Sequence, residues 1–147
     1  MNDKRGLDFA IGTDIVEINR FRNLGSESPF YQRVFTEREL AYCHRFPDPA
    51  PHLAATFAGK EAIVKATNSN CRATINTIEI LRDEDGAPVV DLFQPSNHDI
   101  YVSLAHSSTH AIAVALAVNR SYTMNLNEIK GILERAGTKL LPRRDVS

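Results

Sequence analysis

The first part of the chain changes from a strand-like to a helix-like pattern of apolar residues. Apolar side chains alternate with smaller or polar ones over residues 8–16, which predicts a strand. Over residues 15–24 the apolar side chains recur at helical spacing, which predicts a helix. This change of period places Asp14 at a strand-to-helix transition, and it places Arg20 and Arg22 on the helix.

Two further helices are predicted before the middle of the chain. Thr36 and Glu39 have the spacing of a capping box, which predicts a helix from there to about residue 45. The three prolines of residues 46–51 predict a loop, because proline cannot continue a helix. The alanine-rich segment 52–67 predicts the longest helix of the chain.

One side of the helix predicted over residues 52–67 combines small apolar residues with two charged ones. At 100° per residue this side consists of Ala54, Phe57, Ala58, Glu61, Ala62 and Lys65. Charges on a stripe that would otherwise be buried need an explanation. An ion pair between Glu61 and Lys65, worth about 0.3 kcal/mol, is one explanation, and a chemical role is the other.

The second half of the chain has the pattern of strands. Strands are predicted over residues 75–81 and 88–92, and Asp85-Gly86 between them is a hairpin turn signal. Residues 101–105 and 111–118 predict two more, the last with alanine alternating with bulkier residues. This order predicts an α+β fold, with an antiparallel sheet packed against one long central helix and shorter helices.

The length of 147 residues fits one domain. We assign it to residues 1–120, and the predicted extension over 121–147 consists of a short helix over 125–136 and a basic tail. The longest apolar run, 111–118, is far shorter than the ~20 residues of a membrane-spanning helix. The polar start over residues 1–6 lacks the apolar region of a signal peptide, so a cytoplasmic protein is expected.

Charge and cysteine content exclude some classes of protein. The net charge of −1 argues against a bulk electrostatic grip on nucleic acid. Residues 18–46 nevertheless carry five arginines against three glutamates, which fits either a docking face for an acidic partner or a solvated surface. Cys43 and Cys71 have no CxxC spacing, so reduced structural thiols are predicted.

Two carboxylates are the candidate metal ligands. Asp14 and Glu61 together suit Mg²⁺, which takes one or two protein carboxylates and leaves the other positions to substrate and water. Lys60 and Lys65 flank Glu61 in sequence, and lysine is a compact charge suited to phosphate. The structural alternatives are that Asp14 caps the following helix and that Glu61 pairs with Lys65.

His106 ends a predicted strand and opens a Ser-Ser-Thr turn. Its ring can donate to a phosphate oxygen, or it can bond the backbone of the turn. His110 lies four residues further on, the spacing of a zinc pair on a helix, but the surrounding residues predict strand and turn instead.

Taken together, these residues resemble a known family, the holo-acyl-carrier-protein synthases, which are the small 4′-phosphopantetheinyl transferases. The resemblance covers residues 9–118 and rests on five segments in the family's order. These are Ile11-Gly-Thr-Asp14-Ile-Val-Glu17-Ile-Asn-Arg20, Phe35-Thr-Glu-Arg-Glu39, Phe57-Ala-Gly-Lys60-Glu61-Ala-Ile-Val-Lys65-Ala66, Ile78-Glu-Ile80 with Asp85-Gly86-Ala-Pro88, and Val102-Ser-Leu-Ala-His106-Ser107.

The resemblance implies transfer of the 4′-phosphopantetheine arm of coenzyme A to a serine of an apo acyl carrier protein, with release of adenosine 3′,5′-bisphosphate. It implies that Asp14 and Glu61 hold Mg²⁺ against the pyrophosphate, that Lys65 contacts phosphate and that His106 lies at the nucleotide. It further implies that Arg20 docks the acidic carrier, and that a homotrimer has its active sites between subunits. Fatty acid biosynthesis is the expected setting, and a carrier of secondary metabolism fits the same motifs.

Two departures from the family pattern affect the expected coenzyme A site. Thr56 stands where the family usually has an arginine, so one phosphate contact is expected to be missing. Lys60, Lys65 and His106 are the residues expected to bind coenzyme A. Residues 67–71 replace a glycine-rich turn.

The general base that accepts the serine proton is left unassigned between Glu61 and a water. The alternatives to the transferase are a catalytically weakened module that binds carrier proteins and a hydrolase of nucleotide pyrophosphates.

Overall fold

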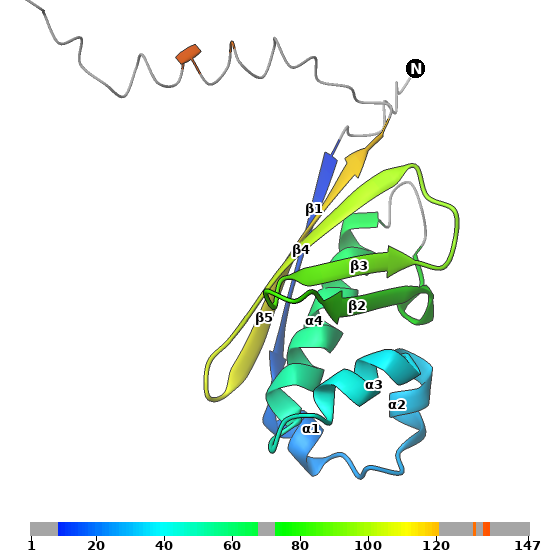
Figure 1. The fold of residues 1–147 in the computed structure, drawn as a ribbon, viewed down its shortest axis with the longest axis vertical. Coiled ribbons are helices and arrows are strands. Elements are labelled where there is room, and N and C mark those ends of the chain that lie inside the picture. Colours follow the sequence, from blue (N-terminus) through cyan, green and yellow to red (C-terminus); the bar gives the residue numbers. More distant parts are fainter. Residues whose placement is uncertain (1–8, 68–72, 121–130, 132–133, 136–147) are drawn as a thin grey trace, which may run out of the picture.

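The computed structural model describes residues 9–67, 73–120, 131 and 134–135. One strand and four helices form the first half of the chain (Figure 1): β1 (Phe9–Glu17), α1 (Asn19–Asn23), α2 (Pro29–Val34), α3 (Glu37–Cys43) and α4 (Ala50–Thr67). A short 3-10 helix and four strands follow: η1 (Ile75–Thr77), β2 (Ile78–Arg82), β3 (Pro88–Leu92), β4 (His98–His106) and β5 (His110–Asn119).

The strands form two antiparallel sheets on either side of the long helix. One sheet has three strands in the order β1-β5-β4, and the other is the β2-β3 hairpin. Helix α4 runs along the three-stranded sheet, with the hairpin crossing in front of it, and α1, α2 and α3 gather around its first half (Figure 1). The predicted α+β architecture with a long central helix is confirmed.

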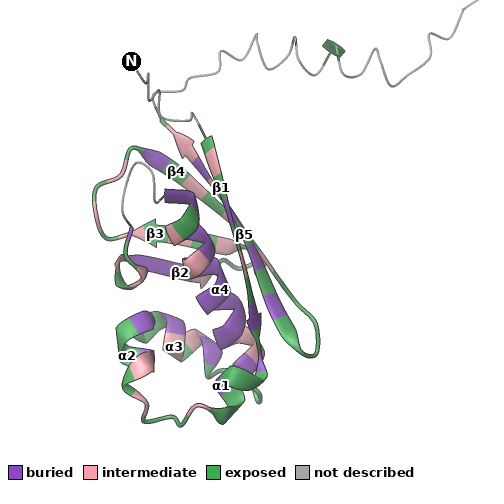
Figure 2. Ribbon diagram, turned by 180° about the vertical axis from the view of Figure 1, so that it is seen from behind, coloured by how far each residue is buried: buried purple, intermediate pink, exposed green. Residues whose placement is uncertain are grey.

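Small residues allow α4 to lie close to the three-stranded sheet. The alanines of β5 that point towards α4, Ala111, Ala113, Ala115 and Ala117, are at most 1% exposed. Gly12 of β1 makes the closest approach, since a Cβ atom there would lie 1.9 Å from the carbonyl oxygen of Ala62. Figure 2 shows the resulting core as a buried band along α4 and β5. The predicted division of 111–118 into a small and a bulky face is therefore confirmed.

The opposite face of the three-stranded sheet is apolar and exposed. Phe9, Ile11, Ile15 and Tyr101 are each 57% to 65% exposed, and Ile112 and Val114 of the central strand lie on the same face. Exposed apolar patches of this kind mark interaction surfaces. We refer to these six residues as the open sheet face.

Local sequence signals explain the short helices. The predicted capping box is present, because the Thr36 hydroxyl accepts from the backbone N–H of Glu39 and the Glu39 carboxylate accepts from that of Thr36. Helix α2 was not predicted, although Ser28 caps it and Pro29 occupies its first position, both common at helix starts.

Three predicted boundaries are corrected. Strand β1 continues to Glu17, so Asp14 lies within the strand and does not cap a helix, and α1 has only five residues. Helix α4 begins at Ala50, because proline is tolerated in the first turn, where the N–H groups have no helical partner. The predicted turn over 67–71 and the extension over 121–147 lie almost entirely outside the described residues.

No helix among the described residues is both long enough and apolar enough to span a bilayer.

Candidate active site

Asp14 and Lys65 form an ion pair between β1 and α4. Asp14 Oδ1 lies 2.8 Å from Lys65 Nζ, which also donates to the Thr13 carbonyl oxygen at 2.8 Å. The alternation of β1 turns Asp14 towards α4, with Gly12 and Val16. The Asp14 side chain is 17% exposed and that of Lys65 is 53% exposed, so the pair lies at the edge of the core, accessible to solvent.

Glu61 lies one helical turn before Lys65 but does not pair with it. The alternative that Glu61 and Lys65 simply stabilise α4 as an ion pair is therefore wrong. Among the described residues Glu61 has no hydrogen bond or ion pair, and it is only partly buried. It lines a pocket together with Asp14, Glu17, Arg20 and Phe57. The structure thus brings both predicted metal ligands and Arg20 into one pocket.

The chemistry of this pocket fits a hard divalent cation. Its side-chain oxygen donors are the carboxylates of Asp14, Glu17 and Glu61, and the last two are without a partner in the described part of the chain. The described residues contain no group of three or more histidine, cysteine, aspartate or glutamate side chains close enough to enclose a metal ion. Mg²⁺ suits such a site, because it binds through one or two carboxylates and keeps other positions for water and phosphate.

Aromatic rings hold Arg20 at the rim of the pocket. Its guanidinium carbon lies 5.2 Å from the ring centroid of Phe57 and 5.5 Å from that of Phe30, within the range of cation–π contacts. Arg20 is exposed and has no carboxylate partner among the described residues. It therefore presents a fixed positive charge beside the two candidate ligands.

Lys60 belongs to the core, which corrects its predicted role at coenzyme A. Its side chain is fully buried, with Nζ 2.7 Å from Glu39 Oε2 and in a further hydrogen bond to the Val34 carbonyl oxygen. Burial lowers the pKa of Lys60, and the nearby Glu39 carboxylate opposes this effect. With no exposed surface, Lys60 cannot reach a phosphate.

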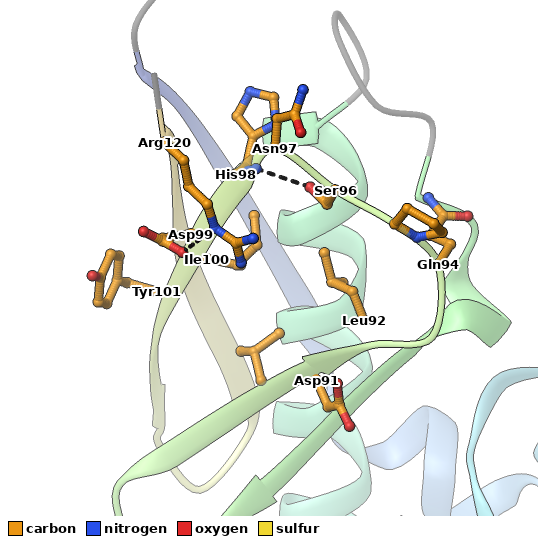
Figure 3. A pocket seen from close by; sticks show the side chains of 12 residues that line it. Asp91, Leu92, Gln94, Ser96, Asn97, His98, Asp99, Ile100, Tyr101 and Arg120 are labelled. Carbon is orange, nitrogen blue, oxygen red and sulfur yellow. Dashed lines mark hydrogen bonds and ion pairs between the residues drawn. The ribbon is translucent and has the colours of Figure 1, made fainter. Parts of the chain in front are cut away.

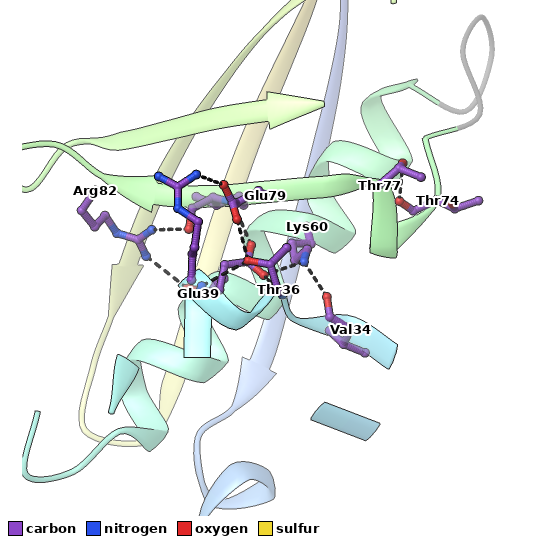
Figure 4. A network of polar contacts seen from close by, with 11 residues as sticks. Val34, Thr36, Glu39, Lys60, Thr74, Thr77, Glu79 and Arg82 are labelled. Carbon is purple, nitrogen blue, oxygen red and sulfur yellow. Dashed lines mark hydrogen bonds and ion pairs between the residues drawn. The ribbon is translucent and has the colours of Figure 1, made fainter. Parts of the chain in front are cut away.

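The Lys60–Glu39 pair is part of a buried network that joins α3, α4 and β2 (Figure 4). Glu39 Oε1 accepts the backbone N–H of Ile80 at 2.7 Å. The neighbouring carboxylate of Glu79 accepts from the Thr36 hydroxyl at 2.7 Å and from Arg38 at 2.8 Å. The charges of Lys60 and Arg38 are compensated by Glu39 and Glu79, so this network fixes the hairpin against α4.

His106 lies at the end of β4, outside the pocket of Asp14 and Glu61. It is exposed, and its Nδ1 lies 3.2 Å from the Ser107 carbonyl oxygen. Its ring centroid is 6.1 Å from that of His52, in the first turn of α4. His52 precedes Glu61 by nine residues, or about 14 Å along a helix axis. The predicted nucleotide and metal residues are therefore separated within this chain.

Sequence reasoning missed the residues around His106. His52 stacks on Phe46, with ring centroids 3.6 Å apart, and Arg82 of β2 donates to the Thr56 hydroxyl at 3.4 Å. The contact of His52 with Phe46 spans the proline-rich loop, whose conformation the sequence pattern does not predict. The contact of Arg82 with Thr56 joins residues 26 positions apart in sequence. Neither spacing has a motif that could have revealed it.

A second pocket, between β3 and β4, contains none of the predicted site residues (Figure 3). Arg120 and Asp99 form an ion pair in it, with Arg120 Nε 2.7 Å from Asp99 Oδ1, and the backbone N–H of His98 donates to the Ser96 hydroxyl at 3.1 Å. The buried Nδ1 of His98 has no hydrogen-bond partner. We assign no chemistry to this pocket.

Comparison with protein families identifies the class of this chain. Residues 10–116 match the family model of the 4′-phosphopantetheinyl transferase superfamily. The chain belongs to this superfamily, and the resemblance predicted from its motifs is confirmed.

Individual proteins similar to this chain are named as holo-acyl-carrier-protein synthases. The holo-[acyl-carrier-protein] synthase of Clostridium botulinum (strain Alaska E43 / Type E3) is 42% identical over 115 residues, which cover 72% of this chain and 94% of the relative. A crystal structure of a holo-(acyl-carrier-protein) synthase from Bacillus anthracis str. Ames, in complex with CoA (3′,5′-ADP), matches with a TM-score of 0.63 at 27% identity. That match covers 75% of this chain and 96% of the other.

A structure of the Helicobacter pylori holo-[acyl-carrier-protein] synthase in complex with coenzyme A gives a TM-score of 0.62 at 28% identity, covering 73% of this chain and 98% of the other. Sequence and fold therefore place this chain among the same enzymes, as predicted. The predicted enzyme class, a phosphopantetheinyl transferase, agrees with the names of these relatives.

Proposed function

We propose that this protein transfers the 4′-phosphopantetheine arm of coenzyme A to a serine of an apo acyl carrier protein and releases adenosine 3′,5′-bisphosphate. The observation that carries the proposal is the single pocket holding an unpaired Glu61 beside the Asp14–Lys65 ion pair. The relatives named as holo-acyl-carrier-protein synthases supply the substrates.

In the proposed reaction the serine oxygen forms a bond to the phosphorus that carries the pantetheine arm. The P–O bond to the bridging oxygen of the pyrophosphate breaks, and that oxygen leaves with adenosine 3′,5′-bisphosphate. Mg²⁺ held by Asp14 and Glu61 would supply electrostatic stabilisation of the pyrophosphate. Lys65 holds Asp14 in place and presents an exposed ammonium group to the same phosphates. Glu61, or a water beside it, accepts the serine proton.

Arg20 is the proposed contact for the carrier protein. Its guanidinium is held on two aromatic rings at the mouth of the pocket and has no carboxylate to neutralise it in the described structure. By contrast, Arg22 on the same helix is paired with Asp48, and Arg38 on α3 is paired with Glu79. A free charge at this position can orient an acidic helix, because complementary charge controls orientation and the rate of encounter more than affinity.

The open sheet face supports the proposed homotrimer with shared active sites. Its exposed apolar residues need a partner surface, and Ile15 on that face directly follows Asp14 in β1. Assembly through this face can bring the His106 end of one subunit to the Asp14 pocket of the next, which would unite groups that are separate within one subunit.

A mixed-subunit experiment tests the shared site. Glu61→Gln and His106→Ala subunits, each weakly active alone, are unfolded, mixed in equal amounts and refolded. If each site uses Glu61 of one subunit and His106 of the next, about a quarter of the sites regain both residues, with the corresponding activity. Activity no higher than that of the separate variants would show that each subunit works alone.

The transfer itself is tested by intact-mass spectrometry. An apo acyl carrier protein is incubated with this protein, coenzyme A and Mg²⁺, with EDTA in a parallel reaction. The proposal predicts that the carrier gains the mass of one phosphopantetheine arm only without EDTA. Binding of the carrier without any mass gain would instead support a non-catalytic binding module. Release of phosphopantetheine without a carrier would support a pyrophosphate hydrolase. Localisation in the cytoplasm, where both substrates occur, completes the proposal.

A further inference from the structure

Arg82 is held in a fixed position at the end of β2. Its Nη2 donates to the Thr56 hydroxyl at 3.4 Å and its Nη1 to the Leu81 carbonyl oxygen at 3.2 Å. The guanidinium carbon lies 5.4 Å from the ring centroid of Tyr42. The side chain is half-buried; α3 supplies Tyr42, α4 supplies Thr56, and the Leu81 carbonyl belongs to β2 itself. Arg82 is therefore placed by the fold and does not move freely on the surface.

This guanidinium has no carboxylate partner. Among the described residues, none lies within ion-pair distance of Arg82, whereas Arg22, Arg38 and Arg120 each have one within 2.8 Å. The nearby carboxylate of Glu39 is already bound to Lys60. A half-buried cation without a counter-charge is costly for the fold, so its position calls for an anion from outside.

The groups around Arg82 favour the same ligand. His52 and His106 approach each other with ring centroids 6.1 Å apart, and both are open to solvent in part. Burial is the largest cause of the lowered pKa of His52; His106 and Arg82 lower it further, and the Asp48 carboxylate opposes them. An anion bound between Arg82 and these rings would be attracted by the guanidinium and could accept a hydrogen bond from either imidazole.

We infer that Arg82 binds the terminal phosphate of the nucleotide end of coenzyme A, the 3′-phosphate, and thereby sets the preference for this substrate. The inference rests on the proposed function. In the proposed function, Lys65 and the carboxylates of Asp14 and Glu61 act on the pyrophosphate of coenzyme A. The phosphate that remains is the 3′-phosphate, a dianionic monoester. A planar guanidinium can bind such a group through two hydrogen bonds.

The role of Thr56 follows from this assignment. At the position where the family resemblance predicted a lost phosphate contact, the Thr56 hydroxyl is buried and accepts from Arg82. The positive charge for the phosphate is therefore supplied by Arg82 on β2 instead of by an arginine at position 56 on α4. Thr56 is thus a positioning residue, and it acts on the phosphate only through the guanidinium of Arg82.

Substrate comparison tests the inference directly. Transfer from coenzyme A and from 3′-dephospho-coenzyme A is measured for wild type, Arg82→Gln and the matched control Arg120→Gln, which removes an arginine at the far end of β5. Loss of a charge-assisted contact predicts that Arg82→Gln lowers kcat/KM for coenzyme A about ten- to a hundredfold, with little change for the dephospho substrate. Arg120→Gln should leave both values unchanged.

Direct binding provides a readout that does not need transfer. Calorimetry with adenosine 3′,5′-bisphosphate and with adenosine 5′-monophosphate should show that Arg82→Gln removes the advantage of the bisphosphate, while Thr56→Val, which keeps the charge, reduces that advantage in part. If wild type transfers the arm but Arg82→Gln weakens both nucleotides equally, or neither, the inference is overturned. If wild type prefers the bisphosphate and Arg82→Gln removes that preference, but wild type transfers nothing, the proposed function fails and Arg82 keeps its role in binding the 3′-phosphate.

Discussion

Two lysines on the same helix should respond to the same substitution in opposite ways. Lys60 and Lys65 lie five residues apart on α4, and sequence alone suggested a phosphate role for both. In the structure Lys60 is fully buried against Glu39, whereas Lys65 is half exposed beside Asp14. Replacement of each by methionine keeps an unbranched side chain of similar length and removes the ammonium group, with its charge and its hydrogen bonds.

The burial of the Lys60–Glu39 and Lys65–Asp14 pairs determines how much free energy of unfolding each substitution should cost. Lys60→Met leaves the Glu39 carboxylate buried and uncompensated, which costs about 3–5 kcal/mol of the free energy of unfolding. That is a large share of the ~5–15 kcal/mol of a typical domain. Lys65→Met breaks a pair accessible to solvent, so we expect at most about 1 kcal/mol.

Urea unfolding at one fixed protein concentration measures both effects. With a slope of about 2 kcal/mol per molar urea, Lys60→Met should lower the midpoint by about 2 M and Lys65→Met by about 0.5 M or less. Transfer activity should show the reverse order, with the greater loss in Lys65→Met. The double variant Lys60→Met/Glu39→Gln should recover part of the stability, because a neutral amide needs no counter-charge and can still accept the Ile80 N–H.

One pattern of results would refute this reasoning. If Lys60→Met were within about 1 kcal/mol of wild type in stability and lost its affinity for coenzyme A, then Lys60 would contact substrate. The buried pair would then not describe the working enzyme.

Two further predictions concern packing and pH. Gly12→Ala places a methyl group 1.9 Å from the Ala62 carbonyl oxygen and should destabilise the fold by at least about 3 kcal/mol, whereas Gly25→Ala, with open space around it, should be near neutral by thermal melting. Burial, His106 and Arg82 lower the pKa of His52, so the folded state binds fewer protons there than the unfolded state. Stability from His52 is therefore lost as pH falls from about 7, and a neutral phenylalanine at position 52 should flatten that decline.

Local patterns were sufficient to predict most of the elements. The capping box at Thr36 and the alanines of β5 were predictable because each depends on residues a few positions apart. Asp14 was misplaced because the apolar residues on both sides of it fit a strand and a helix alike, and the register with Ala113 decides for the strand. Motif spacing also identified Asp14 and Glu61, which the fold brings to one pocket.

The remaining features depend on contacts between distant segments. Whether a lysine of α4 is buried or exposed depends on α3 and β2, which supply Glu39 and cover Lys60. The motif contains both lysines, so it could not separate their roles. The anchoring of Arg82 by Thr56 likewise depends on how the hairpin packs on α4.

The most direct test of the central claim is the rate of carrier modification by Glu61→Gln, with Glu27→Gln on an exposed loop as the matched control. Both variants are first shown to be folded by their melting curves, and the carrier is followed by intact-mass spectrometry with saturating Mg²⁺ and coenzyme A. The account predicts that Glu61→Gln loses at least about a hundredfold in rate, as expected for loss of a group that stabilises the transition state or accepts a proton, while Glu27→Gln matches wild type. Full activity of a folded Glu61→Gln enzyme would contradict the assigned site.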